Sequence, residues 1–132
     1  MKVTVDTNVL VRAVVRDDKK QAQAAATLLK NAEVIAVSQT CLCEFVWVLR
    51  RIYNFGRHDI SSALHALLDA SNVQVNRPAA DAGLAVLDAG GDFADGVIAF
   101  EGSWLGGETF VSFDNQAVTL IAKQGQRVSL LA

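Results

Sequence analysis

Hydrophobic residues follow two different spacings along the chain. Short runs rich in Val, Ile and Phe predict strands, and longer segments in which apolar residues recur every three or four positions predict helices. The expected strands cover residues 2–5, 34–37, 73–75, 109–113 and 128–131. The expected helices cover residues 8–15, 19–32, 38 or 40 to about 53, 59–70, 78–87, 92 to about 105, and 115 to about 123. Strands and helices therefore alternate along most of the chain.

Polar residues mark where several of these elements begin and end. Ser38 or Thr40 is in position to cap the helix after the second strand, and residues 54–56, which include Gly, are typical of its end. Pro78 suits the first turn of a helix. Strands that alternate with helices imply a parallel sheet covered on both faces. We therefore expect a single α/β domain over residues 1–132.

Charge is divided unevenly along the chain. There are 12 Lys and Arg residues against 14 Asp and Glu, a formal net charge of −2. Residues 1–66 hold nine basic and six acidic side chains, whereas residues 67–132 hold three basic and eight acidic ones. A net acidic chain does not bind nucleic acid through charge alone. A hydrophobic content of 52% excludes intrinsic disorder.

The two cysteines do not form a recognisable metal site. Cys41 and Cys43 have no neighbouring Cys or His to complete four zinc ligands, so we expect them to be small apolar residues buried on a helix. Asp6 interrupts the apolar stretch that a signal peptide would need after Lys2, and no segment approaches the roughly 20 apolar residues of a membrane span. These features predict a reduced, cytoplasmic protein that makes no use of a membrane.

Acidic residues directly follow two of the expected strands. Asp6 ends the run Val-Thr-Val-Asp, and Asp114 ends the run Phe-Val-Ser-Phe-Asp. In open parallel sheets, ligands bind beyond the carboxyl ends of the strands. We therefore expect both carboxylates to project over the same edge of the sheet.

Three further acids lie on helices, and each has a structural alternative. Asp92-Phe-Ala-Asp95 opens a helix, so Asp92 is equally well explained as an N-cap, whereas Asp95 beside Gly96 is harder to explain in that way. Glu44 lies at the margin of an apolar stripe and has no basic residue three or four positions later. A lone surface Glu remains the alternative for that position.

Clustered carboxylates need a counter-charge. Two like charges at a separation of about 4 Å cost about 4 kcal/mol at an effective dielectric constant of about 20. Sites made only of oxygen ligands suit Mg²⁺ or Mn²⁺. A divalent ion held in this way lowers the pKa of a bound water and neutralises charge on a phosphodiester. The acidic residues therefore favour metal-dependent phosphodiester hydrolysis.

Four motifs also lie in a recognisable order along the chain. They are Met-Lys-Val-Thr-Val-Asp6-Thr7-Asn8, Glu44-Phe-Val-Trp-Val-Leu-Arg, Asp92-Phe-Ala-Asp95 before Val-Ile-Ala, and Val-Ser-Phe-Asp114. As a set they resemble a PIN domain over essentially the whole chain. The chain is most similar to the VapC-type toxins of bacterial toxin–antitoxin pairs.

The resemblance implies a compact three-layer α/β/α sandwich with a central parallel sheet of about five strands. It also implies an Mg²⁺- or Mn²⁺-dependent endoribonuclease that acts on RNA, forms a homodimer and is inhibited by a small VapB-like antitoxin protein. Thr7 and Asn8 would support the first turn. The residues that match the acidic set of the family, as catalytic groups and metal ligands, are Asp6, Glu44, Asp95 and Asp114, with Asp92 as an accessory metal ligand.

Two other function classes remain open. A phosphatase or phosphoacceptor domain also places an Asp after its first strand, although Asn8 stands where one class of nucleophilic phosphatase needs a second Asp. The other class is a catalytically silent PIN-like module that only binds partners, and the intact set of acids argues against it. Cleavage of RNA in the presence of Mg²⁺, Mn²⁺ or a chelator separates these classes.

Basic and aromatic residues give the remaining expectations. The basic half of the chain has residues near the first helices and after Glu44 that suit phosphate contacts, although each also suits a solvated helix face: Arg12, Arg16, Lys19, Lys20, Arg50 and Arg51. We expect His58 and His65 on a surface helix. For Trp47, Phe55 and Trp104 we expect packing in the core.

Overall fold

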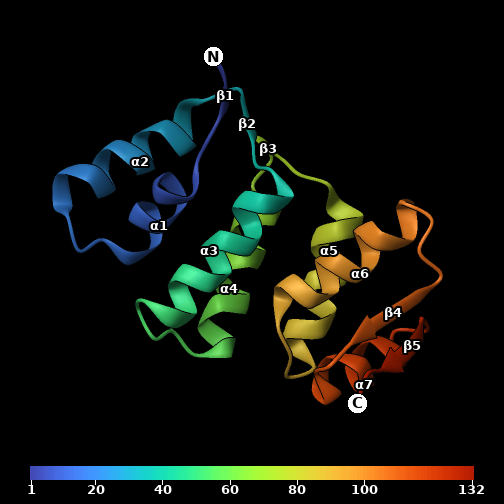
Figure 1. Ribbon diagram of the computed structural model, residues 1–132. Helices are drawn as coiled ribbons and strands as arrows, with labels where there is room; N and C mark the ends of the chain where they lie inside the picture. Colours follow the sequence, from blue (N-terminus) through green and yellow to red (C-terminus); the bar gives the residue numbers. More distant parts are fainter. The chain divides into compact units, whose positions relative to one another are not determined.

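The computed structural model describes all residues from Met1 to Ala132, and they fall into two compact units. The first unit covers Met1–Arg77 and the second covers Pro78–Ala132. In Figure 1 the first unit is coloured from blue to green, and the second runs from yellow to red. Each unit has its own helices, parallel strands and buried core.

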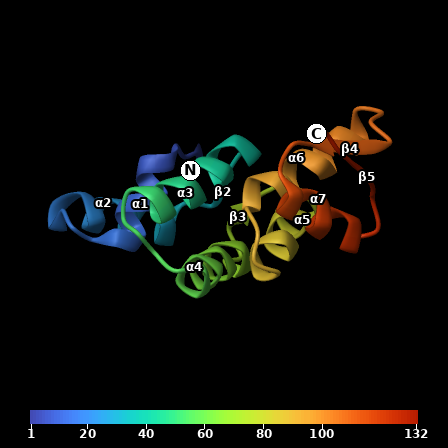
Figure 2. The same cartoon turned by 60° about the horizontal axis from the view of Figure 1, so that its bottom comes forward.

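The first unit contains a three-stranded parallel sheet and four helices. Its elements are β1 (Lys2–Thr4), α1 (Thr7–Val15), α2 (Lys19–Asn31), β2 (Val34–Ala36), α3 (Gln39–Arg51), α4 (Arg57–Asp69) and β3 (Val73–Gln74). The strand order is β1-β2-β3, and Ile35 pairs with Val3 on one side and with Val73 on the other. Parallel neighbours need crossover connections, and pairs of helices provide them here. Figures 1 and 2 both show α1 lying against α2.

The second unit contains a pair of parallel strands and three helices. Its elements are α5 (Arg77–Asp88), which begins at the last residue of the first unit, α6 (Phe93–Trp104), β4 (Thr109–Ser112), α7 (Asn115–Lys123) and β5 (Arg127–Leu130). β4 and β5 pair in parallel from Thr109 opposite Arg127 to Ser112 opposite Leu130. The connection between them is α7, which packs against both strands.

The core of the first unit comes from the apolar stripes of its helices. Fully buried side chains include Leu42, Phe45 and Leu49 on α3, together with Leu64 on α4 and Ile35 at the centre of the sheet. Residues at i, i+3 and i+7 share one helix face, so the sequence pattern of α3 sets which side packs inward. The opposite side of α3, which carries Glu44, is left exposed.

The core of the second unit depends on close approach of α5 and α6. Phe93 is completely buried, and its ring occupies the space that a side chain at Gly83 would need. A Cβ atom on Gly96 would lie 2.4 Å from the carbonyl oxygen of Ala82. Glycine therefore lets the two helix backbones touch next to Asp95.

The structure confirms each expected strand and helix, with ends shifted by one or two residues. Ser38 is the cap of α3, because its side chain accepts a hydrogen bond from the Cys41 N–H at 3.0 Å. The expected central sheet of about five strands is seen as the three-stranded sheet of the first unit and the two-stranded sheet of the second. A helix-rich α/β fold is thus confirmed, and a continuous five-stranded sheet is not shown.

One smaller expectation needs correction. Cys41 is buried, but Cys43 is only partly buried, and the two cysteines do not form a disulfide. Ile52, the C-cap of α3, is exposed. None of the helices has the length and apolar character that crossing a membrane requires.

Candidate functional site

Asp6 lies where β1 gives way to α1. It is the N-cap of α1, and its Oδ1 accepts a hydrogen bond from the Val9 N–H at 3.2 Å. An Asp in this place satisfies one of the unpaired N–H groups at a helix start and places negative charge at the positive end of the helix dipole. The side chain is exposed, so a charged ligand has access to it.

Glu44 and Asp6 both influence the Cys41 thiol in the first unit. The hydroxyl of Thr7 donates to Cys41 Sγ over 3.9 Å, which joins the start of α1 to α3. Burial raises the pKa of the Cys41 thiol; the Thr7 hydrogen bond opposes the shift, and the charges of Glu44 and Asp6 add to it. The first unit therefore places two of the expected acids close enough to the Cys41 thiol for their charges to affect it.

Asp92 and Asp114 occupy equivalent positions at the starts of two helices in the second unit. Asp92 is the N-cap of α6, and its Oδ1 accepts from the Ala94 N–H at 3.1 Å. Asp114 is the N-cap of α7, and its Oδ1 accepts from the Ala117 N–H at 3.2 Å. Helix capping is therefore one role of both aspartates. Each capping bond uses only one of the two carboxylate oxygens, so the other oxygen is not used by the cap.

Asp95 is the acid of the second unit whose environment is most unusual. It is partly buried in the first turn of α6 and does not act as a cap. Burial raises the pKa of Asp95, and the nearby negative charges of Asp92 and Asp114 raise it further. The second unit therefore places Asp92 and Asp114 close enough to Asp95 for their charges to affect it.

The donor chemistry of these residues fits a hard divalent cation. All five expected ligands are carboxylates, which Mg²⁺ and Mn²⁺ prefer. Burial and the neighbouring negative charges both raise the pKa of Asp95, and a bound cation would offset the contribution of those charges. No group of three or more His, Cys, Asp or Glu side chains is arranged to hold a metal ion as the structure stands.

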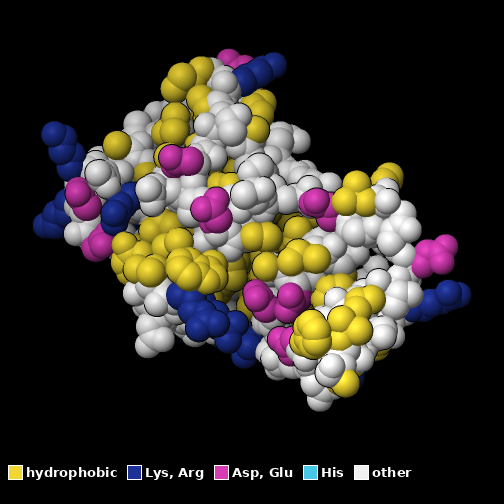
Figure 3. All heavy atoms as spheres, in the orientation of Figure 1, with side chains coloured by type: hydrophobic (Ala, Val, Ile, Leu, Met, Phe, Trp, Pro, Cys, Tyr) yellow, Lys and Arg dark blue, Asp and Glu magenta, His cyan; other side chains and the backbone are white.

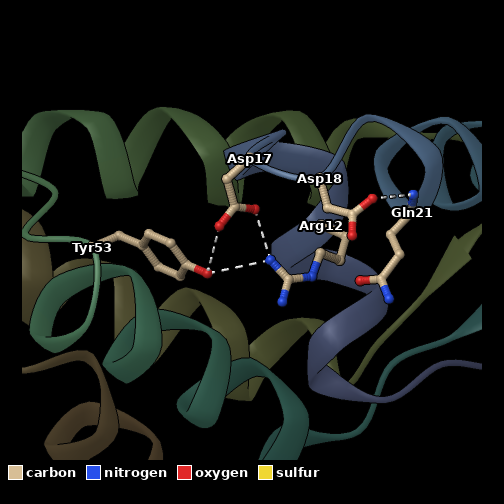
Figure 4. A network of polar contacts seen from close by, with 5 residues as sticks. All are labelled: Arg12, Asp17, Asp18, Gln21 and Tyr53. Atoms are coloured by element: carbon tan, nitrogen blue, oxygen red, sulfur yellow. Dashed lines mark hydrogen bonds and ion pairs between the residues drawn. The ribbon is translucent and has the colours of Figure 1, made fainter.

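One of the expected phosphate-binding residues is already engaged in a polar network (Figure 4). Arg12 Nη1 donates to Asp17 Oδ1 at 2.7 Å and to the Tyr53 hydroxyl at 3.4 Å, and that hydroxyl donates to Asp17 Oδ2 at 3.3 Å. Desolvation alone would raise the pKa of Asp17, but the hydrogen bond and charge of Arg12 outweigh it and lower the pKa. Arg12 therefore ties the segment after α3 to the end of α1.

The expectations for the histidines are confirmed, and those for the tryptophans are wrong. His58 and His65 are exposed on α4, as expected. Core packing is wrong for both tryptophans, because Trp47 is 57% exposed and Trp104 is 78% exposed. The sequence does contain a signal for the exposure of Trp47: it follows the charged residue Glu44 by three positions, and residues i and i+3 share a helix face.

Comparison with known proteins identifies the family. The family model described as "PIN domain" matches residues 3–118, which span both units. No curated protein sequence matches the chain. PIN domains are typically metal-dependent nucleases that act on RNA.

Proposed function

Because the chain belongs to the PIN domain family, we propose that it is an Mg²⁺- or Mn²⁺-dependent endoribonuclease that hydrolyses RNA phosphodiester bonds. The observation that carries the proposal is the environment of Asp95, which is partly buried and lies near Asp92 and Asp114; burial, and then the charges of these two acids, raise its pKa. Carboxylates that repel one another are costly for a fold unless a ligand compensates for them. A divalent cation is the ligand that this donor set favours.

Among the acids of the proposed set, Asp6 and Asp95 would bind the metal directly, and Glu44 and Asp114 would complete the set of ligands. Asp92 caps α6 and contributes as an accessory ligand, because its second carboxylate oxygen is not used by the cap. When bound, a divalent ion supplies charge neutralisation for the phosphate and lowers the pKa of the attacking water. Glu44 and Asp114 would help to activate the attacking water.

The capping bonds are part of this arrangement. Asp6 and Asp114 are each held in place by a backbone N–H that bonds to Oδ1. A carboxylate fixed in this way loses little further side-chain freedom when it binds a cation. In both residues the capping bond leaves Oδ2 available to the cation.

The finer features of the proposal come from the resemblance to VapC-type toxins. They are a toxin role, inhibition by a small VapB-like antitoxin, a homodimer, a cytoplasmic location and one PIN domain over residues 1–132. A single central sheet of about five strands is also part of the proposal, and it is supported by the parallel direction of every strand pair.

The test is cleavage of a labelled RNA by the full chain in Mg²⁺, Mn²⁺ or EDTA. We expect metal-dependent cleavage that EDTA abolishes and that Asp6→Asn and Asp95→Asn each reduce strongly. Asp88→Asn is the matched control, because Asp88 is an exposed acid on α5 outside the proposed set. Asn remains a good N-cap, so loss of activity in Asp6→Asn would reflect charge and not unfolding.

Three outcomes would overturn the proposal. Cleavage that persists unchanged in both Asn variants would show that these acids are not the site. Absence of cleavage with every metal, together with hydrolysis of a phosphate monoester, would indicate a phosphatase instead. Absence of both activities, with tight binding to a protein partner, would indicate a binding module.

A further inference from the structure

Helix α3 carries an exposed strip that leads away from the proposed metal ligand Glu44. Trp47 follows it by three residues and Arg51 by seven, so the three side chains share one side of the helix. With a rise of about 1.5 Å per residue, Trp47 lies about 4.5 Å along the helix axis from Glu44, and Arg51 about 10.5 Å. An acid, an aromatic ring and a cation therefore follow one another along a single rigid element.

Trp47 is available for contact. It is 57% exposed, although the other large apolar residues of α3, such as Phe45 and Leu49, are fully buried. No ring contact involves it, whereas the other tryptophan, Trp104, lies against Phe100 with ring centroids 6.5 Å apart. An exposed indole that the core does not use is a site for stacking or for association.

The positive charge around Trp47 indicates which kind of molecule could bind there. Arg50 and Arg51 occupy the last turn of α3, are exposed, and form no ion pair, in contrast to Arg12. Figure 3 shows Lys and Arg side chains gathered beside hydrophobic ones where α3 ends and α4 begins. The first unit holds ten basic and seven acidic residues, a net charge of +3. An aromatic ring next to unpaired cations fits a nucleic acid strand with unstacked bases.

The segment that follows the strip is held in place. The hydroxyl of Tyr53 donates to Asp17 and accepts from Arg12, which fixes the chain just after α3 (Figure 4). Asn54 then takes a left-handed conformation with φ of 57° and turns the chain towards α4. This anchoring keeps the end of α3 rigid, so a base that stacks on Trp47 would not have to order a loop.

We propose that Trp47, with Arg50 and Arg51, forms a platform on which the proposed RNA substrate stacks an unpaired base and places its phosphates. The inference rests on the proposed ribonuclease function and narrows its substrate to single-stranded RNA or unpaired loops. A base-paired duplex offers no free base face to the ring and binds this platform poorly.

The test measures RNA binding in EDTA, so that neither metal binding nor cleavage enters the result. Trp104→Phe leaves Trp47 as the only tryptophan of the chain, and its fluorescence reports directly on stacking. We expect a single-stranded oligouridylate to quench this emission, and the same strand annealed to its complement to quench it far less. Trp47→Leu should weaken single-strand binding by roughly 5- to 150-fold.

Three variants separate stacking from a structural effect. Trp47→Phe keeps a ring and should recover part of the affinity, and Trp104→Leu is the matched control for loss of an exposed indole. Arg51→Ala should lower the slope of log K against log salt by about 0.7 for each phosphate of a single strand that is no longer neutralised. A structural role at the end of a helix would not change that slope.

The proposal is overturned if Trp47 emission does not respond to RNA, or if Trp47→Leu binds single strands as tightly as the wild type. It is also overturned if Trp47→Leu changes the oligomeric state and leaves RNA affinity unchanged, because the strip would then be a protein interface. Quenching without any metal-dependent cleavage would leave the platform standing as an RNA-binding surface and refute the proposed ribonuclease function instead.

Discussion

Substitution of Gly96 tests how closely the structure places α5 against α6. An added Cβ would lie 2.4 Å from the Ala82 carbonyl oxygen and 2.8 Å from the Gly83 Cα. Both are backbone atoms, so no side-chain rotation relieves the contact and one helix must move. Overpacking of this kind costs about 1–3 kcal/mol, whereas Ala in place of Gly within a helix favours folding by about 1 kcal/mol. We therefore expect Gly96→Ala to lower the free energy of unfolding by up to about 2 kcal/mol.

Gly102 provides the matched control on the same helix. A Cβ there meets no atom within 4 Å, so only the helix propensity changes. We expect Gly102→Ala to raise the free energy of unfolding by up to about 1 kcal/mol. Urea denaturation followed by circular dichroism measures both variants. Equal stability of the two variants, or a more stable Gly96→Ala protein, would refute the close approach of α5 and α6.

Three further predictions follow from single contacts. Asp18→Ala should destabilise the fold by about 1 kcal/mol in thermal unfolding, because Asp18 is the N-cap of α2, whereas Asp18→Asn should change little. Because Cys41 is buried with a raised pKa, a thiol reagent should modify Cys43 first and reach Cys41 only as the protein unfolds; equal rates would contradict this. Since Arg12 lowers the pKa of Asp17, the pair stabilises the fold above the unfolded pKa of Asp17, near 3.8, and this stabilisation is lost as pH falls through the lower folded value. The stability difference between wild type and Asp17→Asn should therefore disappear in acid, and a difference that grows in acid would reverse the assigned sign.

The sequence was most informative about local structure. Hydrophobic spacing and capping residues such as Ser38 were sufficient to place each element, because both act over a few residues. The partition of strands into a set of three and a pair was not predictable in this way. Strand pairing depends on contacts between residues far apart in the chain, and hydrophobic spacing carries no information about them.

For the candidate site, the sequence identifies the acidic residues but does not show which of them also cap helices. From the sequence, Asp92 is either a helix cap or a metal ligand, and the structure shows that it caps α6. Asp6 and Asp114 were expected only as acids beyond strand ends, yet both also cap helices. The sequence predicts core packing for Trp47, whereas the folded chain leaves this side chain exposed.

The central claim is that the acids of the proposed set bind a divalent metal ion, and Mn²⁺ binding tests it most directly. Calorimetric titration of the full chain should show Mn²⁺ affinity that falls by roughly tenfold or more in both Asp6→Asn and Asp95→Asn, because even the loss of a group that only orients a ligand costs that much. Asp88→Asn should bind Mn²⁺ as the wild type does. Wild-type affinity in either the Asp6 or the Asp95 variant would contradict the claim.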